Sequence, residues 1–180
     1  SWDVSNVTQM NYTFRAASSF NGDISNWDLS SLYDMEAMFH SAFNFNQDIS
    51  SWNVSNVIDM DAMFENTQNF NGDISNWDVS NVTIMRKMFK NSSSFNGNIS
   101  SWDISNVTNM EEMFDGTQSL SNYNKCAINA SFSLNDNWPY DWSDHCFFTP
   151  FSKEELQTAV DLWVSDNIAA LDTYGEINTW

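Results

Sequence analysis

Residues 52–76, WNVSNVIDMDAMFENTQNFNGDISN, form one complete unit of a pattern that recurs along most of this 180-residue chain. Each unit begins at a tryptophan, and the next unit begins 25 residues later. The tryptophans at this first position are Trp2, Trp27, Trp52, Trp77 and Trp102. Position 4 of the unit is always Ser, position 9 always Met and position 13 always Phe. Because a unit this short cannot bury its own apolar side, the five units are expected to stack on one another.

Local patterns within each unit predict its secondary structure. Residues 49–55 contain β-branched and aromatic side chains and predict a short strand. Met60, Met63 and Phe64 lie at i, i+3 and i+4, which predicts one helical turn. Residues 70–73, Phe-Asn-Gly-Asp, have the composition of a tight turn. We therefore predict a repeat solenoid with one short strand and one helical turn in each 25-residue coil.

The recurring motif has the form I-S-x-W-D-V-S-N-V-T-x-M-x-x-M-F, followed by F-N-G-D-I-S. It resembles the BspA-type leucine-rich-repeat-like repeats of bacterial cell-surface proteins and of secreted proteins of microbial eukaryotes. The resemblance covers residues 1–120. It implies a leucine-rich-repeat-like fold used for surface adhesion or display, and it implies no catalytic residues.

The remaining residues divide the chain into four predicted parts. Residues 1–120 form the five-coil solenoid, and residues 121–150, which hold both cysteines and both prolines, are expected to cap its open end. A disulfide between Cys126 and Cys146 is favoured over two free thiols. Residues 151–176 begin with a capping box and predict the helical entry cap of a following module. Residues 177–180 repeat the residue types that precede Trp27 and are interpreted as the start of the next repeat strand.

The similarity between the two ends of the chain predicts self-assembly. Trp180 aligns with Trp2, so the chain is expected to be one module of a longer periodic array, joined covalently or by docking. Head-to-tail contacts along the solenoid axis are predicted at Trp2, Ile177 and Trp180. An unpaired leading strand at Trp2 would otherwise be prone to aggregation.

The charge of the chain limits its partners. There are 24 acidic and 6 basic residues, a net charge of −18, which disfavours nucleic acid and anionic lipid surfaces. No apolar segment is long enough for membrane insertion. Aspartates at position 2 of the units are expected to form a column that attracts calcium, or that is solvated by neighbouring Ser and Asn side chains and by salt. The calcium candidates are Asp3, Asp28, Asp78 and Asp103.

Two basic side chains of the fourth unit test the stacking register. Stacking should place Arg86 between Asp61 and Glu111 of the neighbouring units. It should likewise place Lys90 between Glu65 and Asp115. Exposed pairs of this kind contribute about 0.2–1 kcal/mol each, so they specify register more than stability.

Eight Asn-x-Ser/Thr sites are candidates for N-linked glycans. They are Asn6, Asn11, Asn53, Asn81, Asn91, Asn98, Asn106 and Asn129. Asn6, Asn81 and Asn106 share position 5 of their units, where a side-chain ladder that satisfies the backbone is the alternative. Asn11, Asn91 and Asn129 are the preferred glycan sites.

These features predict a non-enzymatic, secreted module found outside the cell or on its surface. The disulfide is typical of an oxidising compartment, and no catalytic motif accompanies the two histidines, His40 and His145. The leading hypothesis is a repeating unit of a glycosylated filament or surface stalk. The alternatives are an adhesin that binds a protein or glycan receptor and, ranked lower, an ice-binding protein. No cofactor is expected apart from glycans and the candidate calcium.

Overall fold

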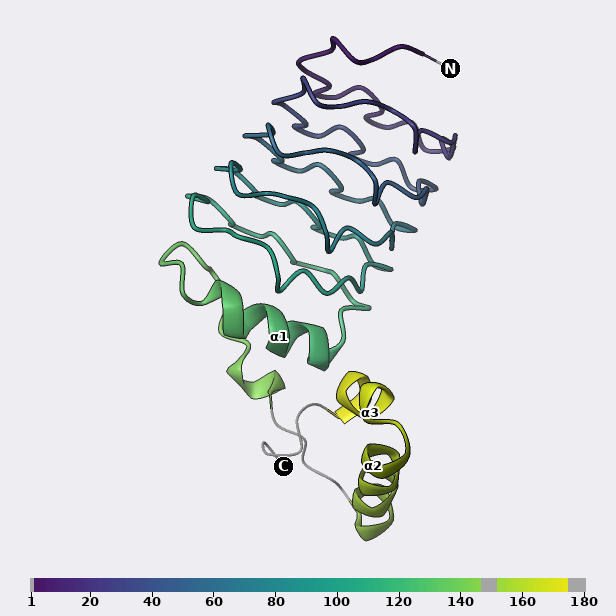
Figure 1. Cartoon of the computed structure of the whole chain (residues 1–180), viewed down its shortest axis with the longest axis vertical. Coiled ribbons are helices and arrows are strands. Elements are labelled where there is room, and N and C mark those ends of the chain that lie inside the picture. Colours follow the sequence, from purple (N-terminus) through teal and green to yellow (C-terminus); the bar gives the residue numbers. More distant parts are fainter. Residues whose placement is uncertain (1, 147–151, 175–180) are drawn as a thin grey trace.

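The computed structural model describes residues 2–146 and 152–174. Residues 2–120 form a stack of five coils, which runs from the purple N-terminal end to the green segment in Figure 1. The helices that follow are α1 (Asn122–Phe132), the 3-10 helix η1 (Ser143–His145), α2 (Lys153–Ser165) and α3 (Asn167–Tyr174). Helix α1 lies across the last coil, at the end of the stack opposite to the N-terminus (Figure 1).

The predicted strand and helical turn in every coil are wrong, and so is the leucine-rich-repeat-like solenoid built from them. Residues 2–120 contain no helix and no strand of a sheet. Each coil instead contributes one residue, at position 8, to a series of isolated parallel bridges. The bridging residues are Gln9, Asp34, Asp59, Ile84 and Asn109. The segment 49–55, expected to be a strand, takes part in no bridge.

Backbone conformation explains why the Met and Phe pattern does not produce a helical turn. Met60, Met63 and Phe64 are all buried, as the spacing predicts. Between them, however, Ala62 has a φ of 52°, in the left-handed region that a right-handed helix excludes. The same conformation occurs at positions 11 and 15 of every coil. The residues are Tyr12, Ala16, Ala37, Ser41, Ala62, Asn66, Lys87, Asn91, Glu112 and Gly116.

These left-handed residues turn alternate backbone N–H groups toward the next coil. The N–H groups at positions 9, 11, 13 and 15 donate to the carbonyl oxygens at positions 8, 10, 12 and 14 of the following coil. In the third coil, Met60 N donates to Ile84 O at 3.0 Å and Phe64 N to Met88 O at 2.9 Å. All four junctions between coils repeat this set, with N···O distances of 2.7–3.0 Å. We call these bonds the axial ladder.

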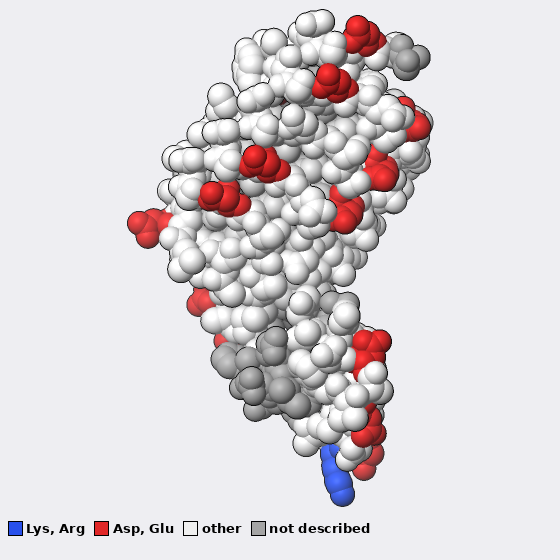
Figure 2. All heavy atoms as spheres, in the orientation of Figure 1, with Lys and Arg blue, Asp and Glu red and all other residues white. Residues whose placement is uncertain are grey.

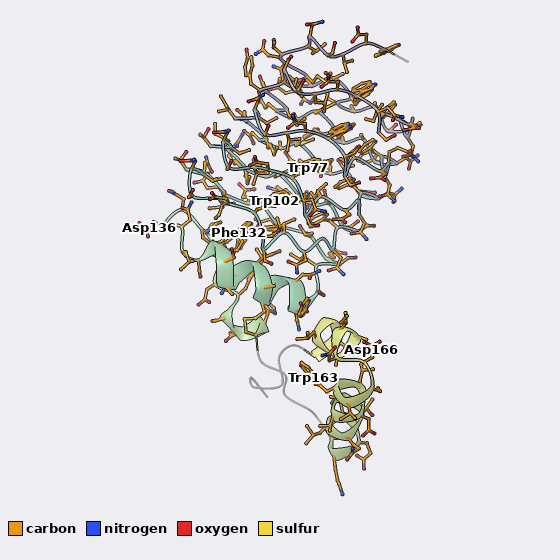
Figure 3. All side chains as sticks on the ribbon, in the orientation of Figure 1. Trp77, Trp102, Phe132, Asp136, Trp163 and Asp166 are labelled. Carbon is orange, nitrogen blue, oxygen red and sulfur yellow. A yellow bond between two sulfur atoms is a disulfide. The ribbon has the colours of Figure 1, made fainter. Side chains whose placement is uncertain are left out.

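Columns of stacked aromatic rings form the core of the coil stack. The rings of Phe39 and Phe64 stack at 5.7 Å between centroids, and those of Trp52 and Trp77 at 6.3 Å. Figure 3 shows Trp77 and Trp102 one above the other along the stack. The buried indole N–H of Trp77 donates to Ile49 O at 3.1 Å, so these tryptophans bury their rings without an unpaired donor.

Polar side chains form further ladders between coils. At position 5, Asn81 Nδ2 donates to Ser55 O and Asn106 Nδ2 to Ser80 O, each at 2.8 Å. At position 20, the Asn71 side-chain oxygen accepts from Asn96 N at 2.8 Å. Because every coil offers the same groups in the same place, bonds to neighbouring coils satisfy the coil backbone together with the turns inside each coil.

The C-terminal end of the stack is covered by the predicted cap region, which contains a regular helix that the sequence did not indicate. Helix α1 begins after Ser121, whose side chain accepts from Asn124 N at 3.2 Å. Cys126 in α1 is bonded to Cys146, with 4.9 Å between their Cα atoms. Tyr140 Oη accepts the Phe114 N–H, an axial-ladder donor with no following coil, at 2.9 Å. The cap thus completes one bond of the ladder.

Helices α2 and α3 form a separate pair beyond the cap. Ser152 caps α2 by accepting from Glu155 N at 3.0 Å, which is the serine half of the predicted capping box. Helix α3 contacts both α2 and α1. The predicted repeat start at 177–180 lies outside the described residues.

Replacing Gly116 with Ala tests the requirement for left-handed residues. Gly116 has a φ of +74°, and a Cβ there would lie 2.3 Å from Asn91 Oδ1. We expect Gly116→Ala to lower the free energy of unfolding by about 1–2 kcal/mol, measured by urea denaturation. Gly22→Ala is the control, since Gly22 does not have the left-handed φ of Gly116 and its Cβ would meet the edge of the Phe20 ring at 3.1 Å. Equal losses in the two variants would contradict the interpretation.

Replacing Asp59 with Asn tests the bridge position. Burial raises the pKa of the Asp59 carboxyl, and repulsion from Asp34, Asp61 and Glu36 raises it further. The hydrogen bond that the carboxyl accepts from Asp61 N–H lowers the pKa and only partly offsets these effects. A raised folded-state pKa means that Asp59 favours folding in acid and loses that contribution as the pH rises through its pKa. Asn109 shows that Asn keeps the bond to the N–H two residues on.

Asp59→Asn should therefore stabilise the protein at pH 7, by less than about 1 kcal/mol because the site is partly solvated. The gain should disappear in acid, where Asp59 is protonated. Thermal unfolding at pH 7 and below pH 3.8 measures both effects. A gain that persists unchanged in acid would show that charge is not its cause.

Candidate functional site

The N-terminal end of the coil stack is an open aromatic face. Trp2 is 72% exposed, whereas its counterpart Trp52 inside the stack is 4% exposed. Trp2 stacks on Trp27 on one side only, with 6.3 Å between the ring centroids. A groove of about 490 Å³ opens at this end. Its lining is Trp2, Phe14, Phe20, Gly22, Asp23, Ile24, Asn26 and Trp27. We call this surface the open end.

The open end is an interrupted version of the interface between interior coils. Phe14 and Phe20 are only partly buried, whereas Phe39 and Phe45 in the next coil are fully buried. The rings nevertheless keep the interior geometry, with Phe14 and Phe20 at 4.0 Å and Phe39 and Phe45 at 3.9 Å between centroids. The ring geometry at this end is therefore the same as inside the stack.

A second groove, of about 510 Å³, lies where the last coil meets the loop after α1. It is lined by Trp102, Asp103, Ile104, Ser105, Ser131, Leu134, Asn135, Asp136 and Asn137. The Leu134 side chain is 87% exposed at its edge. Asn135 Nδ2 fixes the loop by donating to Ile104 O at 2.7 Å and to Val107 O at 2.9 Å.

The predicted aspartate column at position 2 lies on the surface and is partnered within each coil. Asp78 Oδ1 accepts from Ser80 Oγ at 2.7 Å and from Ser80 N at 3.2 Å, and these bonds lower the pKa of the carboxyl. The carboxyl pKa values are likewise lowered at Asp3, Asp28 and Asp103. A parallel column at position 22 includes Asp23, Asp48 and Asp73, each bonded to the serine two residues on. Figure 2 shows acidic side chains at several separate places on the visible face of the stack.

The structure offers no support for the calcium prediction. In residues 2–146 and 152–174, no three or more His, Cys, Asp or Glu side chains are grouped so that they could hold a metal ion. Each position-2 aspartate instead uses an oxygen to bind a serine of its own coil, which corresponds to the solvated alternative.

The basic side chains of the fourth coil are paired, one as predicted and one not. Arg86 Nη2 lies 2.8 Å from Asp61 Oδ2, one of its two predicted partners. Lys90 forms its ion pair with Glu112 rather than with Glu65 or Asp115. Glu112 occupies position 11, whose left-handed backbone conformation the sequence interpretation did not include.

The candidate glycan sites differ in how far their amides are engaged. Asn11, Asn53, Asn91 and Asn98 are exposed on the coils, although Asn91 Nδ2 donates to Asn66 Oδ1 of the preceding coil at 3.0 Å. Asn6, Asn81 and Asn106 are also exposed, but the last two donate to the preceding coil, as the ladder alternative anticipated. Asn129, one of the preferred sites, is half-buried in α1 and accepts from the Trp138 indole at 3.1 Å. Because its side chain is half-buried in the cap, Asn129 is a poor site for attachment of a glycan.

The predicted assembly residues are only partly described. Trp2 lies at the open end, whereas Ile177 and Trp180 lie outside the described residues. Sequence reasoning missed Tyr140, which closes the opposite end, and Trp142, whose ring lies 5.3 Å from that of Phe114. It also assigned the repeated Asn of F-N-G-D to a turn, although its recurrence at position 20 was a visible signal of the ladder found there.

Comparison with known proteins identifies a family but no function. The chain matches the family DUF285, described as Mycoplasma protein of unknown function, over residues 1–74 and again over residues 50–135. No curated protein and no solved structure is significantly similar to the chain. Within the described residues, no helix has both the length and the apolar character needed to cross a bilayer. Because the two matches together cover residues 1–135 of 180, the chain belongs to the DUF285 family.

Proposed function

We propose that the chain is a non-enzymatic structural module on the outside of the cell, of the BspA-type surface-repeat class, and a repeating unit of a glycosylated filament or stalk. The observation that carries the proposal is the axial ladder, which fixes each of the five coils to the next along residues 2–120. The regular ladders of the coils suit a stiff spacer, because each coil is fixed to the next by backbone bonds.

The cap supports an extracellular location. Its disulfide joins residues 20 apart, and such bonds persist mainly in oxidising compartments. The net charge of −18 disfavours nucleic acid and anionic lipid as partners of the module.

Adhesion is the second candidate function, and the groove beside Leu134 favours it. There an exposed apolar side chain lies next to Asp136 and Asn137 at the edge of a groove. Mixed apolar and polar linings of this kind suit a peptide or glycan. Ice binding has no comparable support, because the repeated serines already bond to aspartates within their own coils.

Immunogold labelling of intact, unpermeabilised source cells tests the structural role. Antibodies against the coil stack should label filaments or stalks at the cell surface. Labelling confined to permeabilised cells would contradict the extracellular placement, and surface label without elongated structures would favour the adhesin alternative.

Glycosylation can be tested by producing the protein in a eukaryotic secretory host. Asn11→Gln should remove the mass of one glycan, because Asn11 is exposed at a turn. Asn106→Gln should leave the mass unchanged, because Asn106 Nδ2 donates to Ser80 O at 2.8 Å. Intact-mass measurement before and after glycosidase treatment distinguishes the two. An unglycosylated wild-type protein would remove the glycan part of the proposal.

A further inference from the structure

Comparison of the five coils with one another separates two kinds of surface. Positions 7, 8, 10, 11, 14 and 17 exchange charged, polar and large apolar residues from coil to coil. The other positions hold one residue, or residues of similar character, in most of the coils. At the six varying positions, all residues except Ala37 and Ala62 are exposed or half-buried. We call the surface that they form the variable face.

The constant residues that reach the surface are explained by the fold. At position 2, an Asp or Asn side chain accepts the N–H of the position-4 serine in all five coils, as Asp78 does from Ser80. At position 5, a side chain donates to the position-4 carbonyl of the preceding coil at all four junctions, as Asn81 does to Ser55. No side-chain bond of the described residues recurs in all five coils on the variable face, so the repeat does not determine which residues stand there.

Two large apolar residues are exposed side by side on the variable face. Position 7 is Thr in three coils, whereas the second coil has Tyr33 and the third has Ile58. These residues are 42% and 48% exposed. They lie in consecutive coils that are joined directly, since Ile58 N donates to Tyr33 O at 2.9 Å. Both coils have a neighbouring coil on each side, so this pair is not exposed by an end of the stack. Contiguous exposed apolar side chains of this kind are typical of an interaction site.

Negative charge gathers beside the apolar pair. Asp34 and Asp59 directly follow the two apolar residues in sequence and are joined by the backbone bridge at position 8. Burial, and after it repulsion from Asp34, Asp61 and Glu36, raises the pKa of the Asp59 carboxyl. Residues 27–76 contain no Lys or Arg, and within the described part of the chain Asp34, Glu36 and Asp59 form no ion pair. We call the whole group the acidic–apolar patch; its residues are Tyr33, Asp34, Glu36, Ile58 and Asp59.

The fourth coil shows that the same repeat can compensate such charges. There Arg86 lies 2.8 Å from Asp61, and Lys87 and Lys90 both pair with Glu112. The acidic–apolar patch has no such cations among the described residues, so its carboxylates repel one another in the free protein. A bound cation would relieve the repulsion and lower the pKa of Asp59.

The chemistry of the patch selects one class of partner. A metal ion does not suit it, because in residues 2–146 and 152–174 no three His, Cys, Asp or Glu side chains are grouped so that they could hold one. A neutral ligand would leave the repulsion unchanged. A basic polypeptide meets both requirements, because its Lys or Arg side chains neutralise the carboxylates while apolar side chains between them cover Tyr33 and Ile58.

We propose that the acidic–apolar patch binds a basic polypeptide segment of a partner protein, with apolar side chains between its Lys or Arg residues. The apolar pair supplies the anchor of the contact, and the carboxylates supply its charge complementarity. The patch lies on the side of the stack, so this contact goes beyond the structural role proposed above and does not depend on how modules are joined.

The test measures the binding of a fluorescent peptide of alternating Lys and Leu to the whole chain by anisotropy. Two comparison peptides replace every Lys with Glu or every Leu with Ser. Tyr33→Thr combined with Ile58→Thr restores the residue that the other three coils have at position 7, so this variant is expected to fold. Asp59→Asn removes one charge from the patch. Asp78→Asn is the matched control, since it removes one charge at position 2, where the third coil has Asn53.

We expect the peptide of Lys and Leu to bind saturably, with an affinity that falls as salt is added. The double Thr variant should weaken binding roughly tenfold, and Asp59→Asn about threefold. Asp78→Asn should bind like the wild type, and neither comparison peptide should bind comparably. Carboxyl NMR should show the pKa of Asp59 falling toward its ordinary value of 3.8 when the peptide is bound.

Four results would overturn the proposal. Absence of saturable binding is the first. Equal weakening by Asp78→Asn and Asp59→Asn is the second, because it would show attraction by net charge alone. Equal binding of the peptide with Ser in place of Leu is the third, because the apolar pair would then have no part. An unchanged Asp59 pKa in the bound state is the fourth, because the peptide would then lie elsewhere. Surface labelling of cells does not involve the patch, so failure of this inference and failure of the proposed function can be distinguished.

Discussion

The fold depends on one set of hydrogen bonds, the axial ladder that joins each coil to the next. It requires four N–H groups per coil to point along the stack, and this requires left-handed backbone at positions 11 and 15. Nine of these ten positions hold a residue other than Gly, at a cost of about 1–2 kcal/mol each in an unconstrained chain. Stacking must offset that cost, and the third and fourth coils each bury a Trp, two Phe and two Met side chains.

The core could be predicted from the sequence because burial follows residue type and spacing. Trp52, Met60, Met63, Phe64 and Phe70 all lie inside, as their 25-residue periodicity indicates. The backbone could not be predicted in the same way. The spacing of Met60, Met63 and Phe64 is that of a helical turn, but it records only which side chains share a face. Ala62 carries no sequence signal for a φ of 52°, because alanine ordinarily favours helix.

In the candidate sites, too, the recurring positions could be predicted from the sequence, whereas the partners of the side chains could not. The aspartate column was predictable from recurrence, yet its role depends on a local bond to serine rather than on proximity between coils. Arg86 pairs with Asp61 as the stacking predicted, whereas Lys90 pairs with Glu112, which occupies the left-handed position 11. Tyr140 could not be identified as a cap, since nothing in a single tyrosine after the repeats indicates which N–H it will accept.

The axial ladder joins only consecutive coils, and this has a consequence for how such chains evolve. Deleting or duplicating one whole unit inside the array removes or adds one layer and leaves both ends as they were. An in-frame exchange between misaligned copies of the gene would therefore change the length of the rod in discrete steps without creating a new boundary. Variation in unit number among close relatives is the genetic trace that this architecture would leave.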